Sequence, residues 1–100
     1  MPDNIQKKTI RKIAEISNFK PENIGLECSI IKDLYVDSIN FVELLASLEE
    51  IFDIDIDEKE INYNITVEEL INLVRDLALE DLDRMLKLEK ALKEKKHEIQ

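Results

Sequence analysis

Glycine and proline are scarce in this chain, and their scarcity limits what it can fold into. The 100 residues include one glycine, Gly25, and two prolines, Pro2 and Pro21. Hairpin turns between short strands depend on such residues for their backbone geometry, so a sheet of many strands is disfavoured. The sequence therefore predicts an all-α protein, long enough for one small domain with one core.

The spacing of apolar residues predicts four helices, three longer and one short. The first spans about residues 4–17, the second residues 38–52 and the short third about residues 58–62. The fourth follows Thr66, which together with Glu69 is typical of a capping box.

The connections between these helices carry large apolar side chains that a solvated linker would not need. The loop over residues 20–36 is long for a compact domain, and such loops are usually pinned or functional. The residues expected to pin it are Ile24, Leu26, Ile30, Ile31 and Leu34. Gly25 is expected to form a backbone turn in this loop. Farther along, Ile54 and Ile56 are expected to enter the core.

The second predicted helix has two apolar faces. The broader one is expected to face the core and consists of Phe41, Leu44, Leu45, Leu48 and Phe52. A second strip, Ile39, Val42 and Ala46, is flanked by Glu43 and Glu50. An exposed apolar strip framed by acids suits the docking of a basic, partly apolar partner. The alternative is that these are ordinary surface residues, or that Ile39 packs under the preceding loop.

Asp37 and Ser38 stand where the second helix begins, and both residue types are good helix caps. The unpaired N–H groups and the dipole of a helix start also favour a phosphate there. A phosphodiester on Ser38 would therefore be tolerated, and Ser38 is interpreted as an attachment point.

The apolar stripe of the last helix continues well beyond the expected bundle. We expect a bundle over residues 1–79 and an amphipathic helical tail over residues 80–100, which either prolongs the last helix or folds back after a break between Leu79 and Asp83. Such a tail serves extra packing or self-association. Its many acids disfavour a role at a membrane surface.

Charge and composition exclude several functions. A formal net charge of −9 argues against binding nucleic acid and favours basic partner surfaces. A lone His97 and a lone Cys28 offer no nucleophile with its base and no zinc site. The acids from Asp53 onwards do not form a calcium loop, because Glu58 and Asn64 stand where that loop needs Gly and Glu. The sequence therefore predicts neither an enzyme nor a metal site.

Two further features bear on location. The first residues show no signal peptide, and no stretch is apolar enough to span a bilayer. The single cysteine allows no intrachain disulfide. We therefore expect a cytoplasmic protein.

One motif carries a family resemblance. The run Asp33-Leu34-x-x-Asp37-Ser38-Ile39, with Val42-Glu43-Leu44 and Leu48-Glu49-Glu50-x-Phe52 behind it, resembles the attachment motif and second helix of acyl carrier proteins. The resemblance extends from about Ile10 to Leu77 and implies a four-helix acyl-carrier-like bundle. It implies that a phosphopantetheinyl transferase attaches 4′-phosphopantetheine from coenzyme A to Ser38, next to Asp37, and that the arm's thiol holds an acyl group as a thioester.

The resemblance also implies partners. Enzymes that transfer and elongate acyl chains in fatty-acid, polyketide or related lipid biosynthesis would bind the second helix through basic patches. The positions that match the docking helix are Ile39, Val42, Glu43, Ala46 and Glu50. A monomer is expected, with a tail-mediated dimer as the alternative.

Three residues depart from the family pattern. Tyr35 stands where the family often has Gly, Asn40 replaces a common acid, and Ile51 stands where a charge is usual. Together with the tail, these departures leave two alternatives: the housekeeping carrier of fatty-acid synthesis and a specialised carrier of a dedicated pathway. The competing hypothesis is a non-enzymatic helical interaction module that uses its C-terminal helix, with Ser38 only as a cap.

Overall fold

A computed structural model describes the backbone of residues 2–98 and the side chains of residues 4–80 and 82–92. Within residues 2–98 the α-helices are α1 (Pro2–Ser17), α2 (Ser38–Phe52) and α3 (Val67–Glu98). The 3-10 turns η1 (Pro21–Asn23) and η2 (Glu58–Glu60) lie in the connections. The all-α prediction is confirmed. The expected short helix is the single turn η2.

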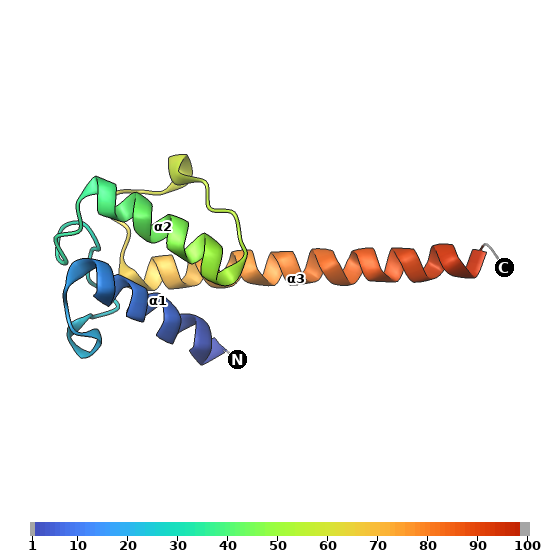
Figure 1. Cartoon of the computed structure of the whole chain (residues 1–100), viewed down its shortest axis with the longest axis horizontal. Helices are drawn as coiled ribbons and strands as arrows, with labels where there is room; N and C mark the ends of the chain where they lie inside the picture. Colours follow the sequence, from blue (N-terminus) through green and yellow to red (C-terminus); the bar gives the residue numbers. More distant parts are fainter. Residues whose placement is uncertain (1, 99–100) are drawn as a thin grey trace.

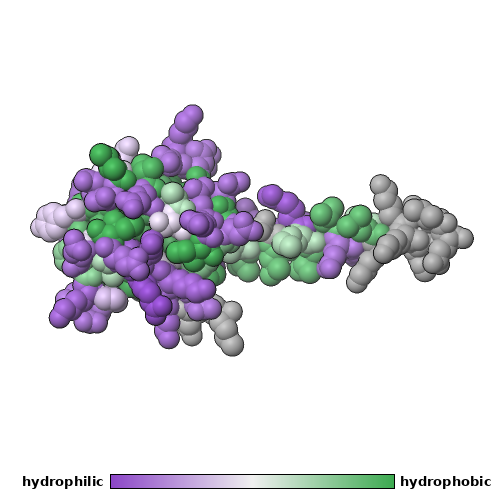
Figure 2. All heavy atoms as spheres, viewed as in Figure 1, coloured by the Kyte–Doolittle hydropathy of each residue, from purple (hydrophilic) through white to green (hydrophobic). Residues whose placement is uncertain are grey.

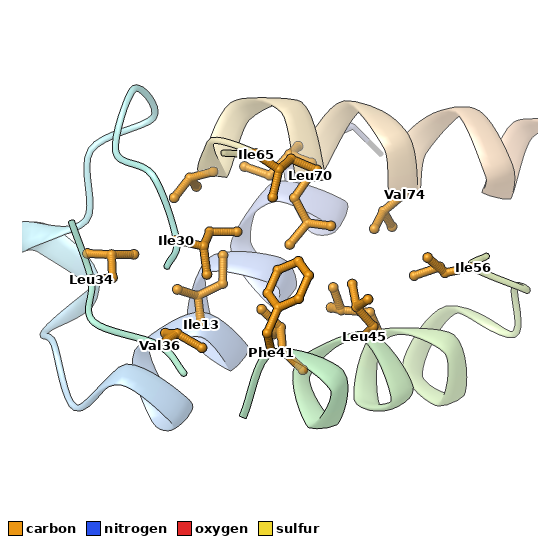
Figure 3. Packing of buried hydrophobic residues seen from close by; sticks show 14 of the residues in the cluster. Ile13, Ile30, Leu34, Val36, Phe41, Leu45, Ile56, Ile65, Leu70 and Val74 are labelled. Atoms are coloured by element: carbon orange, nitrogen blue, oxygen red, sulfur yellow. The ribbon is translucent and has the colours of Figure 1, made fainter. Parts of the chain in front are cut away.

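The core lies between α1, α2 and the first part of α3 (Figures 1 and 3). Phe41 points from α2 towards Leu70 of α3, and Ile13 of α1 packs beside them. The predicted core side of α2 is confirmed, because Phe41 and its three leucines are buried. Phe52, at the end of the helix, is only partly buried.

The loop between α1 and α2 is pinned, but not by all of the residues expected. Ile24, Ile30 and Leu34 are buried. The prediction for Leu26 is wrong, because its side chain is exposed. The backbone of Leu26 fixes the loop to α3 instead, because the Leu26 carbonyl accepts a hydrogen bond of 2.9 Å from the N–H of Glu68 at the start of α3.

Gly25 lies in the turn that was expected there. Its carbonyl accepts a hydrogen bond of 3.2 Å from the N–H of Cys28. The backbone of Gly25 does not have a positive φ. A Cβ at this position would lie 2.8 Å from a carboxylate oxygen of Glu27, which is the end of an exposed, flexible side chain that can move aside.

The connector after α2 is held by one glutamate. Asp53 ends α2 in the left-handed conformation, with a φ of 54°. The Glu49 side chain then accepts a hydrogen bond of 2.9 Å from the N–H of Ile56. Ile54 and Ile56 are buried, as predicted.

α3 begins with the predicted capping box. The Thr66 hydroxyl accepts from the Glu69 N–H at 3.2 Å, and the Glu69 carboxylate accepts from the Thr66 N–H at 2.9 Å. The helix continues without a break to Glu98 and projects from the bundle, giving extents of 60 × 27 × 18 Å (Figure 1). The alternative of a tail that folds back is therefore wrong.

The side chains of the last residues, including His97, lie outside the described part. Across residues 2–98, the structure holds no helix that is both long and apolar enough to cross a membrane.

Candidate functional site

Ser38 is the first residue of α2, and it is exposed. The start of α2 lies at the end of the bundle opposite the projecting part of α3 (Figure 1). Asp37 is the helix cap, because its side chain accepts from the N–H of Asn40 at 2.7 Å and its carbonyl from the N–H of Phe41 at 2.8 Å. Since Asp37 fills the cap role, capping does not explain a serine at position 38.

The residues just before Ser38 are firmly held. Leu34 and Val36 are buried. The N–H of Val36 donates to the Ile30 carbonyl at 3.3 Å, and the N–H of Leu34 donates to the carbonyl of Ser29 at 3.2 Å. A backbone anchored two residues upstream gives the Ser38 hydroxyl a defined position on the surface.

Asp33, the first acid of the sequence motif, has a structural role. Its carboxylate accepts a hydrogen bond of 2.7 Å from the N–H of Ser29. In the same turn, the N–H of Asp33 donates to the Ser29 carbonyl at 2.9 Å. Asp33 therefore closes the turn that leads to Leu34.

The predicted strip on α2 lies on the surface. Ile39 is 78% exposed and Val42 is 43% exposed, and Glu43, Ala46 and Glu50 are exposed as well. The alternative that Ile39 packs under the preceding loop is wrong.

The electrostatic setting of this strip is acidic. Between residues 27 and 69 the only basic residues are Lys32 and Lys59, among many acids. The carboxylates of Asp37, Glu43 and Glu50 belong to exposed residues. A basic partner surface would meet complementary charge here.

The start of α2 also fits a phosphate ester. With the N–H of Asn40 bonded to Asp37, the first-turn N–H groups without an intrahelical acceptor are those of Ser38 and Ile39. These groups and the positive end of the helix dipole favour a negative charge on Ser38. The Ser38 hydroxyl is open to solvent, so a bulky substituent on it meets no buried surface.

Comparison with known proteins decides the family. A family model described as phosphopantetheine attachment site matches residues 7–74. The chain is 38% identical over 73 residues to the acyl carrier protein of Desulforapulum autotrophicum, and the alignment covers 72% of this chain and 95% of that protein. It is 35% identical over 74 residues to the acyl carrier protein of Buchnera aphidicola subsp. Schizaphis graminum, and the alignment covers 74% of this chain and 94% of that relative.

The chain belongs to the acyl carrier protein family. The resemblance seen in the sequence is thus confirmed, and phosphopantetheine is the cofactor of this carrier. The matched region ends at residue 74, inside α3, so the projecting part of that helix lies beyond it.

Tyr35, one of the three departures from the family pattern, has an unusual backbone conformation. Its φ of 56° lies in the left-handed region, which favours glycine, the residue often found there in the family. Its side chain is 81% exposed, so the ring stands on the surface three residues before Ser38. The carrier therefore has a tyrosine in a left-handed backbone conformation directly before Val36.

Sequence reasoning missed one residue that positions the site and one that holds the connector after α2. Val36 is buried, although it was not among the expected pins. An apolar residue directly before the Asp37-Ser38 pair was a usable signal. Glu49 was noted only as part of the motif, and its hydrogen bond to the connector depends on a contact between residues seven positions apart.

Proposed function

We propose that this chain carries acyl intermediates as thioesters on a 4′-phosphopantetheine arm attached to Ser38. The observation that carries the proposal is an exposed serine at the first position of α2, inside the region that matches the family. When attached, the arm supplies a terminal thiol that forms the thioester.

The attachment step uses the Ser38 hydroxyl as a nucleophile under the action of a separate transferase. Its oxygen bonds to the phosphorus that bears the pantetheine in coenzyme A, and the bond from that phosphorus to the bridging diphosphate oxygen breaks. The adenosine bisphosphate part leaves, and the hydroxyl proton is released. The unpaired first-turn N–H groups favour the phosphodiester that results.

The docking surface in this proposal is the exposed strip of α2. Ile39, Val42 and Ala46 supply apolar contact, and Glu43 and Glu50 supply charge. The partners are the phosphopantetheinyl transferase and acyl-transferring and chain-elongating enzymes that present basic patches. Members of this family are carriers rather than catalysts, and we propose no catalytic group for this chain. Its proposed location is the cytoplasm.

The test is a mass measurement. Incubation with coenzyme A and a promiscuous transferase is expected to add one phosphopantetheine to the chain, and Ser38→Ala is expected to abolish the addition. Ser47→Ala is the matched control, because Ser47 is another serine of α2 and lies outside the first turn. A mass gain that survives in Ser38→Ala, or no gain with a transferase that modifies known carriers, refutes the proposal.

A further inference from the structure

The projecting part of α3 carries an apolar stripe that is left uncovered. Five large side chains on it are 54–62% exposed: Leu82, Met85, Leu86, Leu88 and Leu92, here called the tail stripe. All five line a shallow hollow of about 300 Å³ together with Glu89. Figure 2 shows the apolar side chains gathered along this segment, outside the bundle.

The tail stripe continues the side of α3 that faces the core. Met85, Leu88 and Leu92 follow Ile71, Val74 and Ala78 at intervals of two heptads, which is nearly four helical turns. The earlier residues are covered by the bundle, with Ile71 and Val74 fully buried. A helix without tertiary packing is marginally stable in water, so such a stripe is expected to have a partner.

The charges along this segment are divided between its two parts. The part next to the bundle contains the acids Glu80, Asp81 and Asp83 and one base, Arg84, for a net charge of −2. The part towards the C-terminus is rich in lysine. Its lysines are Lys87, Lys90, Lys93, Lys95 and Lys96, and with Glu89, Glu94 and Glu98 residues 85–98 have a net charge of +2. The projecting segment is therefore complementary in charge to its own reversed copy.

We propose that the tail stripe is the interface of a homodimer in which the two projecting helices pack antiparallel. This orientation places the acidic part of one segment beside the basic part of the other. A parallel pair would place like charges together and bring two acidic bundles side by side. The antiparallel dimer also keeps the two bundles at opposite ends, with both α2 starts directed outwards and free (Figure 1).

The size of the stripe predicts a weak dimer. Burying the five side chains in both copies removes on the order of 1,000 Å² of surface, near the lower limit for a specific interface. We therefore expect dissociation in the micromolar range or weaker.

An anionic membrane fits this surface less well than a second copy does. Glu80, Asp83 and Glu89 lie in the same segment as the stripe and would be brought close to negative headgroups. Binding to vesicles is therefore treated as a competing outcome of the test.

The first experiment is sedimentation velocity of the full chain over a wide range of concentration. The parent chain is expected to shift from monomer to dimer, and Leu88→Glu to remain monomeric. Lys87→Gln is the matched control, because it lowers the net charge by one, as Leu88→Glu does, and the 78% exposed Lys87 side chain lies about 100° or more around α3 from every residue of the tail stripe. Far-ultraviolet circular dichroism of each variant checks that the bundle remains folded. Ser38→Ala is expected to dimerise like the parent, which separates this proposal from the carrier proposal.

The second experiment tests the orientation. A spin label is attached to the new cysteine of a chain that carries Gln100→Cys and Cys28→Ala. This spin-labelled chain is then mixed with isotopically labelled parent chain. The antiparallel dimer is expected to broaden amide signals near residues 79–83 of the parent, and added salt is expected to weaken association.

Several results would overturn the proposal. They are a monomer at all concentrations, equal effects of Lys87→Gln and Leu88→Glu, and broadening confined to the C-terminal end of α3. A monomer that binds anionic vesicles and loses that binding in Leu88→Glu would assign the stripe to membranes instead.

Discussion

Replacing Leu45 or Val42 by alanine tests which side of α2 faces the core. The two residues lie three positions apart on the same helix, yet Leu45 is 1% exposed and Val42 is 43% exposed. Leu45 packs with Phe41 and Val74 in the cluster between α2 and α3 (Figure 3). Leu45→Ala therefore loses buried apolar contacts and leaves a cavity. Val42→Ala removes a side chain that is already partly exposed to solvent, so it loses fewer contacts and leaves no enclosed cavity.

The expected losses of stability differ clearly. Deleting the buried part of Leu45 lowers the free energy of unfolding by about 3 kcal/mol from transfer and cavity effects together. Val42→Ala is expected to lower it by less than about 1 kcal/mol. Since each kcal/mol shifts the melting temperature of a domain of this size by about 4–8 °C, the two variants are readily separated.

The assay is urea unfolding followed by far-ultraviolet circular dichroism, read at the midpoint of the cooperative transition. A second readout is the rate of phosphopantetheine transfer, measured where both variants are folded. Val42→Ala is expected to slow the transfer through a weaker docking surface, and Leu45→Ala to leave it near the parent rate. Equal losses of stability would mean that the helix is rotated from the orientation described, and equal transfer rates would remove Val42 from the docking surface.

Two further predictions concern the backbone at position 35 and a buried hydroxyl in α1. Because Tyr35 has a φ of 56°, Tyr35→Gly is expected to be more stable than Tyr35→Ala by about 1 kcal/mol, as measured by urea unfolding. An alanine variant at least as stable as the glycine variant would contradict the left-handed conformation. The Thr9 hydroxyl is fully buried and has no hydrogen-bond partner among the residues that the structure describes, so Thr9→Val is expected to raise the melting temperature, through a gain of about 1 kcal/mol. A fall on this substitution would show that the hydroxyl has a partner in solution.

Much of the site could be predicted because its signals are local. The bounds of α2, its buried side and the capping box at Thr66 each depend on residues within a turn or two of one another. The repeat of apolar residues and the capping side chains act over that range, so they can be read from the order of residues.

The pinned loop before Ser38 was only partly predictable. It has no repeating period, so the sequence shows which residues are apolar and does not show which of them are covered. Leu26 is exposed and Val36 is buried because the loop is fixed by backbone hydrogen bonds to residues near the start of α3, far away in the sequence. The same holds for Glu49, whose role depends on where the connector returns.

The sequence by itself determined that the chain is helical, where α2 begins and that Ser38 stands at its first turn, because caps and periodicity are set by neighbouring residues. Only the tertiary structure decided that Ser38 and the strip behind it are exposed, since exposure depends on what the loop and the other helices cover. It also decided the course of the last helix. The apolar period of residues 80–92 is the same whether the helix continues or folds back, and the structure shows that α3 runs on past the bundle and leaves its stripe uncovered.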